Sequence, residues 1–167
     1  MAAIETTQAT RDDCVALAPV MREADVQELR ASVGSYPLTA LIDGLAQSAE
    51  CWAVRFDGEL ACIWGVSPAV TLGIRVGCIW MLTGEAVEHH KAAFWSECCR
   101  VLPELFERYD VLVNAIDVRH TRAIKWGKRL GFQFQPPKPW GVEGRDFCAF
   151  RVTKEDVACA LLPQSPR

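Results

Sequence analysis

The sequence lacks any apolar run close to the roughly 20 residues that a membrane-spanning helix needs. Its first residues, MAAIETTQATRDD, lack the cationic and apolar pattern of a secretion signal. Internal repeats and low-complexity blocks are absent as well. These absences argue against a membrane, secreted or repeat protein, and we expect a cytoplasmic one.

The eight cysteines never occur at the CxxC spacing of a zinc site or a redox dithiol. His89 and His90 precede Cys98 and Cys99, but neighbours on a helix point about 100° apart, so neither pair converges on one ion. We therefore expect no metal. Most of the cysteines lie inside apolar runs, which favours reduced thiols packed as small hydrophobic side chains.

The chain also lacks an excess of positive charge, because its formal net charge is −3. Basic residues gather only between Arg119 and Arg129. Nucleic acid and anionic membranes are therefore not expected as partners.

The spacing of apolar residues does change along the chain, from a helical period to the pattern of strands. A short strand at 4–8 precedes helical patterns that end near residue 48. Two apolar runs then flank Asp57-Gly58, a dipeptide suited to a tight hairpin turn. The pattern continues with a strand at 75–82, a long helix from His89 with Pro103 expected to kink or split it, a strand at 111–118, a helix at 121–130 and a final strand pair.

This order predicts an α/β (α+β) domain whose mixed sheet has helices on both faces. At 167 residues, one domain is expected, spanning 1–153, with 154–167 as a C-terminal tail. Gly131 follows the helix at 121–130, where a left-handed C-terminal cap is favoured.

The segment HTRAIKWGKRLGF, residues 120–132, resembles the N-x-x-A-x-x-x-Y-x-x-x-G-F pattern of the GCN5-related N-acetyltransferases (GNAT). Ala123 and Gly131-Phe132 match it, whereas Gly127 stands in place of the tyrosine. The opening IETTQATRDD also resembles the start of that family. The resemblance implies a GNAT-like, mostly antiparallel sheet of six to seven strands, and acetyl transfer from acetyl-CoA to an amine.

A narrower resemblance joins the DGELACIWGVSP hairpin, the WMLTG strand end, the helix after His89-His90, and IDVRH followed by RAIKW. Together they resemble a phage-encoded GNAT-like group related to internal virion protein A. This resemblance implies a viral protein in the host cytoplasm or the virion.

The resemblance places the coenzyme A site between the strand at 75–82 and the long helix. The family has a Q/R-x-x-G-x-G/A loop there, while this chain has one glycine, Gly84. A helix N-terminus and nearby positive charge still suit a pyrophosphate. We therefore expect a coenzyme A derivative to be held by residues around this loop and at the start of the helix that follows Arg119: Leu82, Thr83, Gly84, His90, Lys91 and Arg122. An ordinary solvated helix start is the alternative.

Acetyl transfer needs side chains that can accept and donate protons, and this chain has no tyrosine at the family position to donate one. His120 stands at the junction of strand and helix, and an imidazole titrates near neutral pH. Glu85, or Glu88, follows the strand where the family sometimes has its base. Glu85 and His120 are therefore the predicted catalytic residues, with cap or surface roles as the alternative for each.

Two classes of function remain open from the sequence. The first is an acetyltransferase in which two central strands separate and main-chain groups near Leu82 and Thr83 polarise the thioester. The second is a catalytically silent GNAT-fold protein that binds a host or phage protein. Trp140, in a loop, would line an acceptor cleft, form a partner surface or cap the core edge.

Overall fold

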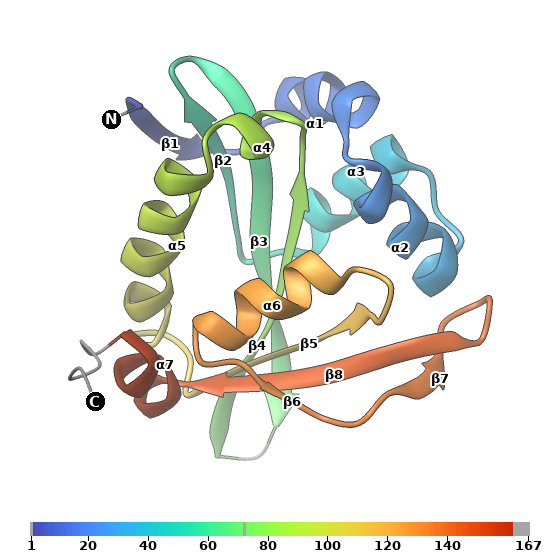
Figure 1. Cartoon of the computed structure of the whole chain (residues 1–167), viewed down its shortest axis with the longest axis vertical. Coiled ribbons are helices and arrows are strands. Elements are labelled where there is room, and N and C mark those ends of the chain that lie inside the picture. The colour runs from blue at the N-terminus through green and yellow to red at the C-terminus, as the bar shows by residue number, and fades with distance from the viewer. Residues whose placement is uncertain (1, 72, 162–167) are drawn as a thin grey trace.

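The computed structural model describes residues 2–71 and 73–161, and these form a single sheet with helices on both faces (Figure 1). The elements in chain order are β1 (Ile4–Gln8), α1 (Arg11–Leu17), a 3-10 turn (Ala18–Val20), α2 (Glu23–Val33), α3 (Pro37–Gln47), β2 (Glu50–Phe56), β3 (Glu59–Thr71), β4 (Ile74–Thr83), α4 (Ala86–His89), α5 (Lys91–Leu105), β5 (Val111–Asp117), α6 (Thr121–Arg129), β6 (Gln133–Phe134), β7 (Lys138–Trp140), β8 (Arg145–Thr153) and α7 (Lys154–Leu161).

The strand order is β1-β2-β3-β4-β5-β8-β6, and β7 pairs with β8 beside β6. Only the β4–β5 pair is parallel, so the predicted mixed, mostly antiparallel α/β sheet is confirmed. Eight strands are described where six or seven were expected. The difference arises because the loop before β8 contains the three-residue strand β7, which its prolines conceal in the sequence.

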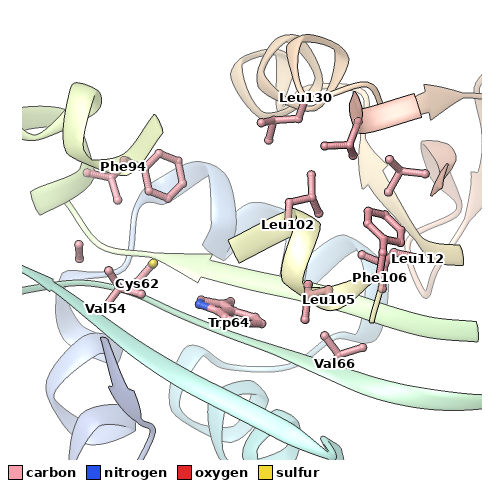
Figure 2. Packing of buried hydrophobic residues seen from close by; sticks show 14 of the residues in the cluster. Val54, Cys62, Trp64, Val66, Phe94, Leu102, Leu105, Phe106, Leu112 and Leu130 are labelled. Carbon is pink, nitrogen blue, oxygen red and sulfur yellow. The ribbon is translucent and has the colours of Figure 1, made fainter. Parts of the chain in front are cut away.

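Successive side chains of β3 point to opposite faces of the sheet and contribute to the hydrophobic core on each face. Cys62, Trp64 and Val66 join the cluster beneath α5, α6 and α7, whereas Ile63 joins the cluster beneath α1 and α3. Figure 2 shows Trp64 and Val66 lying close to Leu105, with Phe94 and Leu102 along the same helix.

The turn chemistry of the sequence is confirmed at the predicted positions. Asp57 and Gly58 both have positive φ, at 50° and 83°, as the hairpin between β2 and β3 requires. Gly131 follows α6 with φ 95°. α7 packs on α5 and buries Val157, so the first eight residues after Thr153 belong to the folded unit.

Pro103 does not split the long helix, which was one of the two predicted outcomes, because α5 continues through it to Leu105. Pro103 lies in the last turn, where the loss of one hydrogen bond is tolerated. The helix begins later than expected, because the backbone of His90, with φ −117° and ψ 39°, is not helical and separates α4 from α5.

The cysteines are all free, and four of them are buried: Cys14, Cys51, Cys62 and Cys148. Among the described residues, His, Cys, Asp and Glu side chains form no group of three that is able to hold a metal ion. Within that same part of the chain, the helices are all too short or too polar to cross a membrane.

Asp13 links the N-terminus of α1 to the sheet. It accepts a 2.8 Å hydrogen bond from the Thr10 backbone N–H, it bonds to Arg55, and Thr10 caps the helix in return. Burial raises the pKa of this carboxyl, but hydrogen bonds from Thr10 and Arg55 outweigh burial and hold it below its ordinary value. The ionised form is therefore stabilising above the unfolded-state pKa, and its contribution is lost as the pH falls.

We expect Asp13→Asn to lower the free energy of unfolding by about 1–2 kcal/mol at pH 7, because the helix cap and the arginine pair are weakened. The difference from the wild type should begin to shrink as the pH falls below about 4, where the unfolded carboxyl takes up a proton, and should vanish only below the lowered pKa of the folded state. Urea unfolding at several pH values measures both. Asp12→Asn on the exposed side of the same turn is the control and should be near neutral. A difference that stays constant as the pH falls below about 4 would contradict the assignment.

Candidate active site

The site is built on a separation of the two parallel strands, as the sequence suggested. β4 and β5 pair over only three positions, from Val76↔Val111 to Cys78↔Val113. Beyond them, β4 stays paired with β3 and β5 with β8. Figure 1 shows β5 turning away from β4 while α6 lies across the two strands.

Asn114 closes the vertex of this opening. Its Nδ2 donates a 2.7 Å hydrogen bond to the Ile79 carbonyl, and its Oδ1 accepts one from the Ala115 N–H at 2.7 Å. One side chain thus fixes where the strands part, but it does not fill the space beyond. The backbone N–H and C=O of a strand residue point to the same side, alternating along the strand, so those of Met81 face the opening as those of Ile79 do. The corresponding groups of Leu82 face β3.

A cavity of about 690 Å³ runs through the opening, which is within the range of small-molecule sites. One part lies between the sheet and α2 and α3, and we call it the α2–α3 side. The other part lies under α5 and α6, and we call it the α5–α6 side. The cavity therefore connects the two faces of the sheet between β4 and β5.

Three cations converge on Glu88 at the rim of the α5–α6 side of the cavity. Arg22 lies 2.8 Å from its carboxylate, Lys91 lies 3.6 Å away, and Arg122 pairs with it directly. Burial raises the pKa of Glu88, but the hydrogen bonds from both arginines outweigh burial and lower it, so the carboxylate stays ionised. The cluster retains excess positive charge beside the N-terminus of α5, where no side chain caps the helix.

Asp25 ties three elements together at the centre of the cavity wall. This buried carboxylate accepts a 2.8 Å hydrogen bond from Thr83 Oγ1 and a 3.2 Å bond from Arg22 Nε, and it lies 3.8 Å from His120 Nε2. The end of β4, the start of α2 and the start of α6 are thereby held in fixed relation.

Glu28, one turn further along α2, is a lining carboxylate that the sequence analysis missed. Its Oε2 accepts a 3.1 Å hydrogen bond from the Asp117 N–H. Burial raises the pKa of Glu28 to about 7, although the charge interaction with His120 and the hydrogen bond from Asp117 act to lower it. Glu28 can therefore exchange a proton near neutral pH. Glu28 could have been found in the sequence from its position three residues after Asp25, which places the two carboxylates on the same face of a helix.

The cavity contacts some of the residues predicted for the site and not others. The lining includes Leu82, Thr83, Lys91, His120 and Arg122. His120 is buried at the start of α6, with 7 % of its surface exposed.

Glu85, Gly84 and His90 lie outside the lining. Glu85 is exposed to solvent. The Gly84 N–H already donates to the Ala61 carbonyl at 2.8 Å. His90 packs on the Phe56 ring at 5.7 Å, away from the cavity. These three residues were predicted for the site from their order in the chain. In the structure they flank the short helix α4 and do not line the cavity.

Gly127 lines the cavity where the family pattern has its tyrosine. A Cβ atom there would lie 3.1 Å from the rings of Phe132 and Phe134, so the two aromatic rings occupy that direction. The neighbouring Trp126 anchors α6 against the Phe94 and Trp95 rings, at 5.2 and 5.1 Å. No proton donor exists at position 127.

Comparison with known proteins identifies the fold as that of the GNAT acetyltransferases. The similar solved structures include an acetyltransferase of the GNAT family from Streptococcus pneumoniae, with 11% identity, 90% of this chain and 99% of that chain covered, and a TM-score of 0.59. YncA from Salmonella typhimurium, solved with its cofactor acetyl-CoA, has 13% identity, 91% and 94% coverage and a TM-score of 0.64. RimJ from Mycobacterium smegmatis, in complex with CoA-disulfide, has 16% identity, 97% and 85% coverage and a TM-score of 0.68.

No protein-family model matches the sequence, and no curated protein matches it. At these identities, the shared property is the fold.

Proposed function

We propose that the protein is an N-acetyltransferase that moves an acetyl group from acetyl-CoA to an amine. The observation that carries the proposal is the cavity through the β4–β5 opening, with a cation cluster on one side and a partly buried carboxylate, Glu28, on the other. The solved neighbours that contain acetyl-CoA or a coenzyme A disulfide support the choice of donor.

The residues present fit an acyl-coenzyme A. Arg22, Lys91 and Arg122 would hold its phosphates together with the free N–H groups at the start of α5. Leu82 and Thr83 remain proposed contacts for the acyl and pantetheine part. Gly84 and His90 lie too far from the lining for the roles expected of them.

The chemistry follows from the groups at the opening. Glu28 accepts a proton from the ammonium, directly or through a water molecule, and the neutral amine attacks the thioester carbonyl. The Met81 N–H is placed to stabilise the oxyanion. This attack forms the C–N bond, the C–S bond then breaks, and the second proton that the nitrogen must lose passes to the thiolate. His120 remains a proposed proton-transfer group. Glu85 is exposed to solvent, so we propose Glu28 in its place as the catalytic base.

We expect acetyl-CoA to bind with micromolar affinity and Arg122→Ala to weaken it about tenfold, or about 1.4 kcal/mol, since one phosphate contact is lost. Calorimetry and thermal shift measure this. Lys125→Ala, on the exposed side of the same helix, is the control and should leave the affinity unchanged. Absence of any stabilisation at acetyl-CoA concentrations well above about 100 μM would overturn the proposal.

The second candidate is a GNAT-fold protein without catalysis that binds a host or phage protein. The glycine at position 127 and the engaged Gly84 N–H favour it. The residue patterns around the β2–β3 hairpin and α6 resemble the phage-encoded group, so a phage origin, with the host cytoplasm or virion as location, is proposed for the acetyltransferase and for this candidate alike. Acetyl-CoA binding without turnover of any amine would favour it over the enzyme.

A further inference from the structure

The α2–α3 side of the cavity, which we call the acceptor side because the proposed function places the amine there, is lined by carboxylates. Glu28 and Asp43 contribute carboxylates to its lining. Among the lining residues described, the cations are Arg22, Lys91 and Arg122, and each lies within 4 Å of Glu88 at the other side. A cationic ligand is therefore favoured here, and an acceptor that carries its own carboxylate or phosphate would meet no counter-charge.

Aromatic rings held in fixed positions form the apolar walls. Trp80 Nε1 donates a 2.8 Å hydrogen bond to Ser48 Oγ. Its ring fits against two glycines, because a Cβ atom would lie 2.6 Å from the ring at Gly44 and 3.0 Å at Gly65. Trp140 packs edge-on to Phe147 at 5.0 Å. These rings prefer an apolar or aromatic skeleton to a polyhydroxylated one.

The turn between β7 and β8 closes one end of the acceptor side. The Val142 N–H donates to the Ser32 carbonyl at 3.1 Å, and the Glu143 N–H donates to the Ala31 carbonyl at 3.2 Å. This turn is therefore fastened to the C-terminal end of α2, and Figure 1 shows the β7–β8 hairpin extending beneath that helix. A polypeptide cannot lie across this end without breaking both bonds.

Resting on the proposed function, we propose that the acceptor is a compact primary amine on an apolar or aromatic skeleton without an anionic group. Its ammonium pairs with Glu28, and its skeleton lies between Trp80 and the Trp140–Phe147 pair. The amine enters end-on, because the docked turn blocks passage across the cavity. In the reaction, the ammonium gives one proton to Glu28, and the resulting neutral amine forms the C–N bond with the acetyl carbon. As the C–S bond breaks, the second proton passes from the nitrogen to the sulfur, so coenzyme A leaves as the thiol.

Two probes that differ by one carboxylate test this selectivity: 2-phenylethylamine and phenylalanine. With acetyl-CoA present, we expect kcat/KM for 2-phenylethylamine to exceed that for phenylalanine by at least about 100-fold, which corresponds to about 2.7 kcal/mol. A short peptide with N-terminal phenylalanine should be the poorer substrate as well. Equal or better turnover of phenylalanine or the peptide would overturn the proposal.

Binding of the amine to the protein alone separates this proposal from the proposed function. By calorimetry without coenzyme, 2-phenylethylamine should bind and phenylalanine should bind at least tenfold more weakly. If acetyl-CoA binds but neither amine gives measurable binding, the acceptor proposal is overturned and the proposed acetyl-CoA site is retained. Amine binding without any acetyl-CoA binding would retain the acceptor site and overturn the transferase.

Glu28→Gln identifies the group that pairs with the ammonium. We expect at least a tenfold loss of 2-phenylethylamine affinity and at least a 100-fold loss of kcat, with acetyl-CoA affinity unchanged. Glu23→Gln, an exposed position on the same helix, is the matched control and should change neither. Unaltered amine affinity in a folded Glu28→Gln variant would overturn the assignment.

Discussion

Gly141→Ala is expected to lower the free energy of unfolding by about 2–5 kcal/mol. Gly141 has φ 77°, where a side chain costs about 1–2 kcal/mol. A Cβ atom there would also lie 2.3 Å from the Ala31 carbonyl oxygen, which is backbone and cannot move aside without shifting the end of α2. Such overpacking adds about 1–3 kcal/mol.

Gly144→Ala separates the two contributions. Gly144 has φ 60° in the same turn, but a Cβ atom there would have no atom within 4 Å. We expect it to cost only the backbone term of about 1–2 kcal/mol. Urea unfolding of both variants measures the difference. Equal losses would mean that the turn is not held against α2 as described.

Leu41→Ala is expected to cost about 2–5 kcal/mol, because Leu41 is fully buried between α3 and the sheet. Its neighbours in that cluster, Leu17 and Ile63, are also fully buried and would border the resulting cavity. Chemical or thermal unfolding monitored by circular dichroism gives the value.

Leu38→Ala, three residues earlier on the same helix, provides the comparison. Leu38 is 42 % exposed, so its truncation should cost less than about 1 kcal/mol. A loss at position 38 as large as that at position 41 would contradict the placement of α3 on the sheet.

Local rules predicted much of this fold from the sequence. The Asp57-Gly58 turn and the cap at Gly131 each depend on residues close in the chain. The separation of β4 and β5 also followed once the order of elements was recognised. β7 and the continuation of α5 through Pro103 did not follow, because pairing with β8 and packing of α5 override local preference.

The site was harder to predict, since its charges come from four distant segments. Arg122 and Lys91 were found because they follow expected helix starts. Glu28 was missed, because the pKa of its carboxyl is shifted by burial, which no spacing rule reports. Glu85 was chosen from chain order, but the short helix α4 places it in solvent.

The brief pairing of β4 with β5 has a mechanical consequence. The links that the structure describes between the sub-sheet β1–β4 and the sub-sheet β5–β8 at their junction are three residue pairs, the Asn114 amide, and the hydrogen bonds between Arg75 and Asp110, the residue before β5. Small rotations of one sub-sheet against the other would change the width of the gap much more at Thr83 than at Cys78. A bound molecule that spans the gap would act as a cross-brace and stiffen the two halves together.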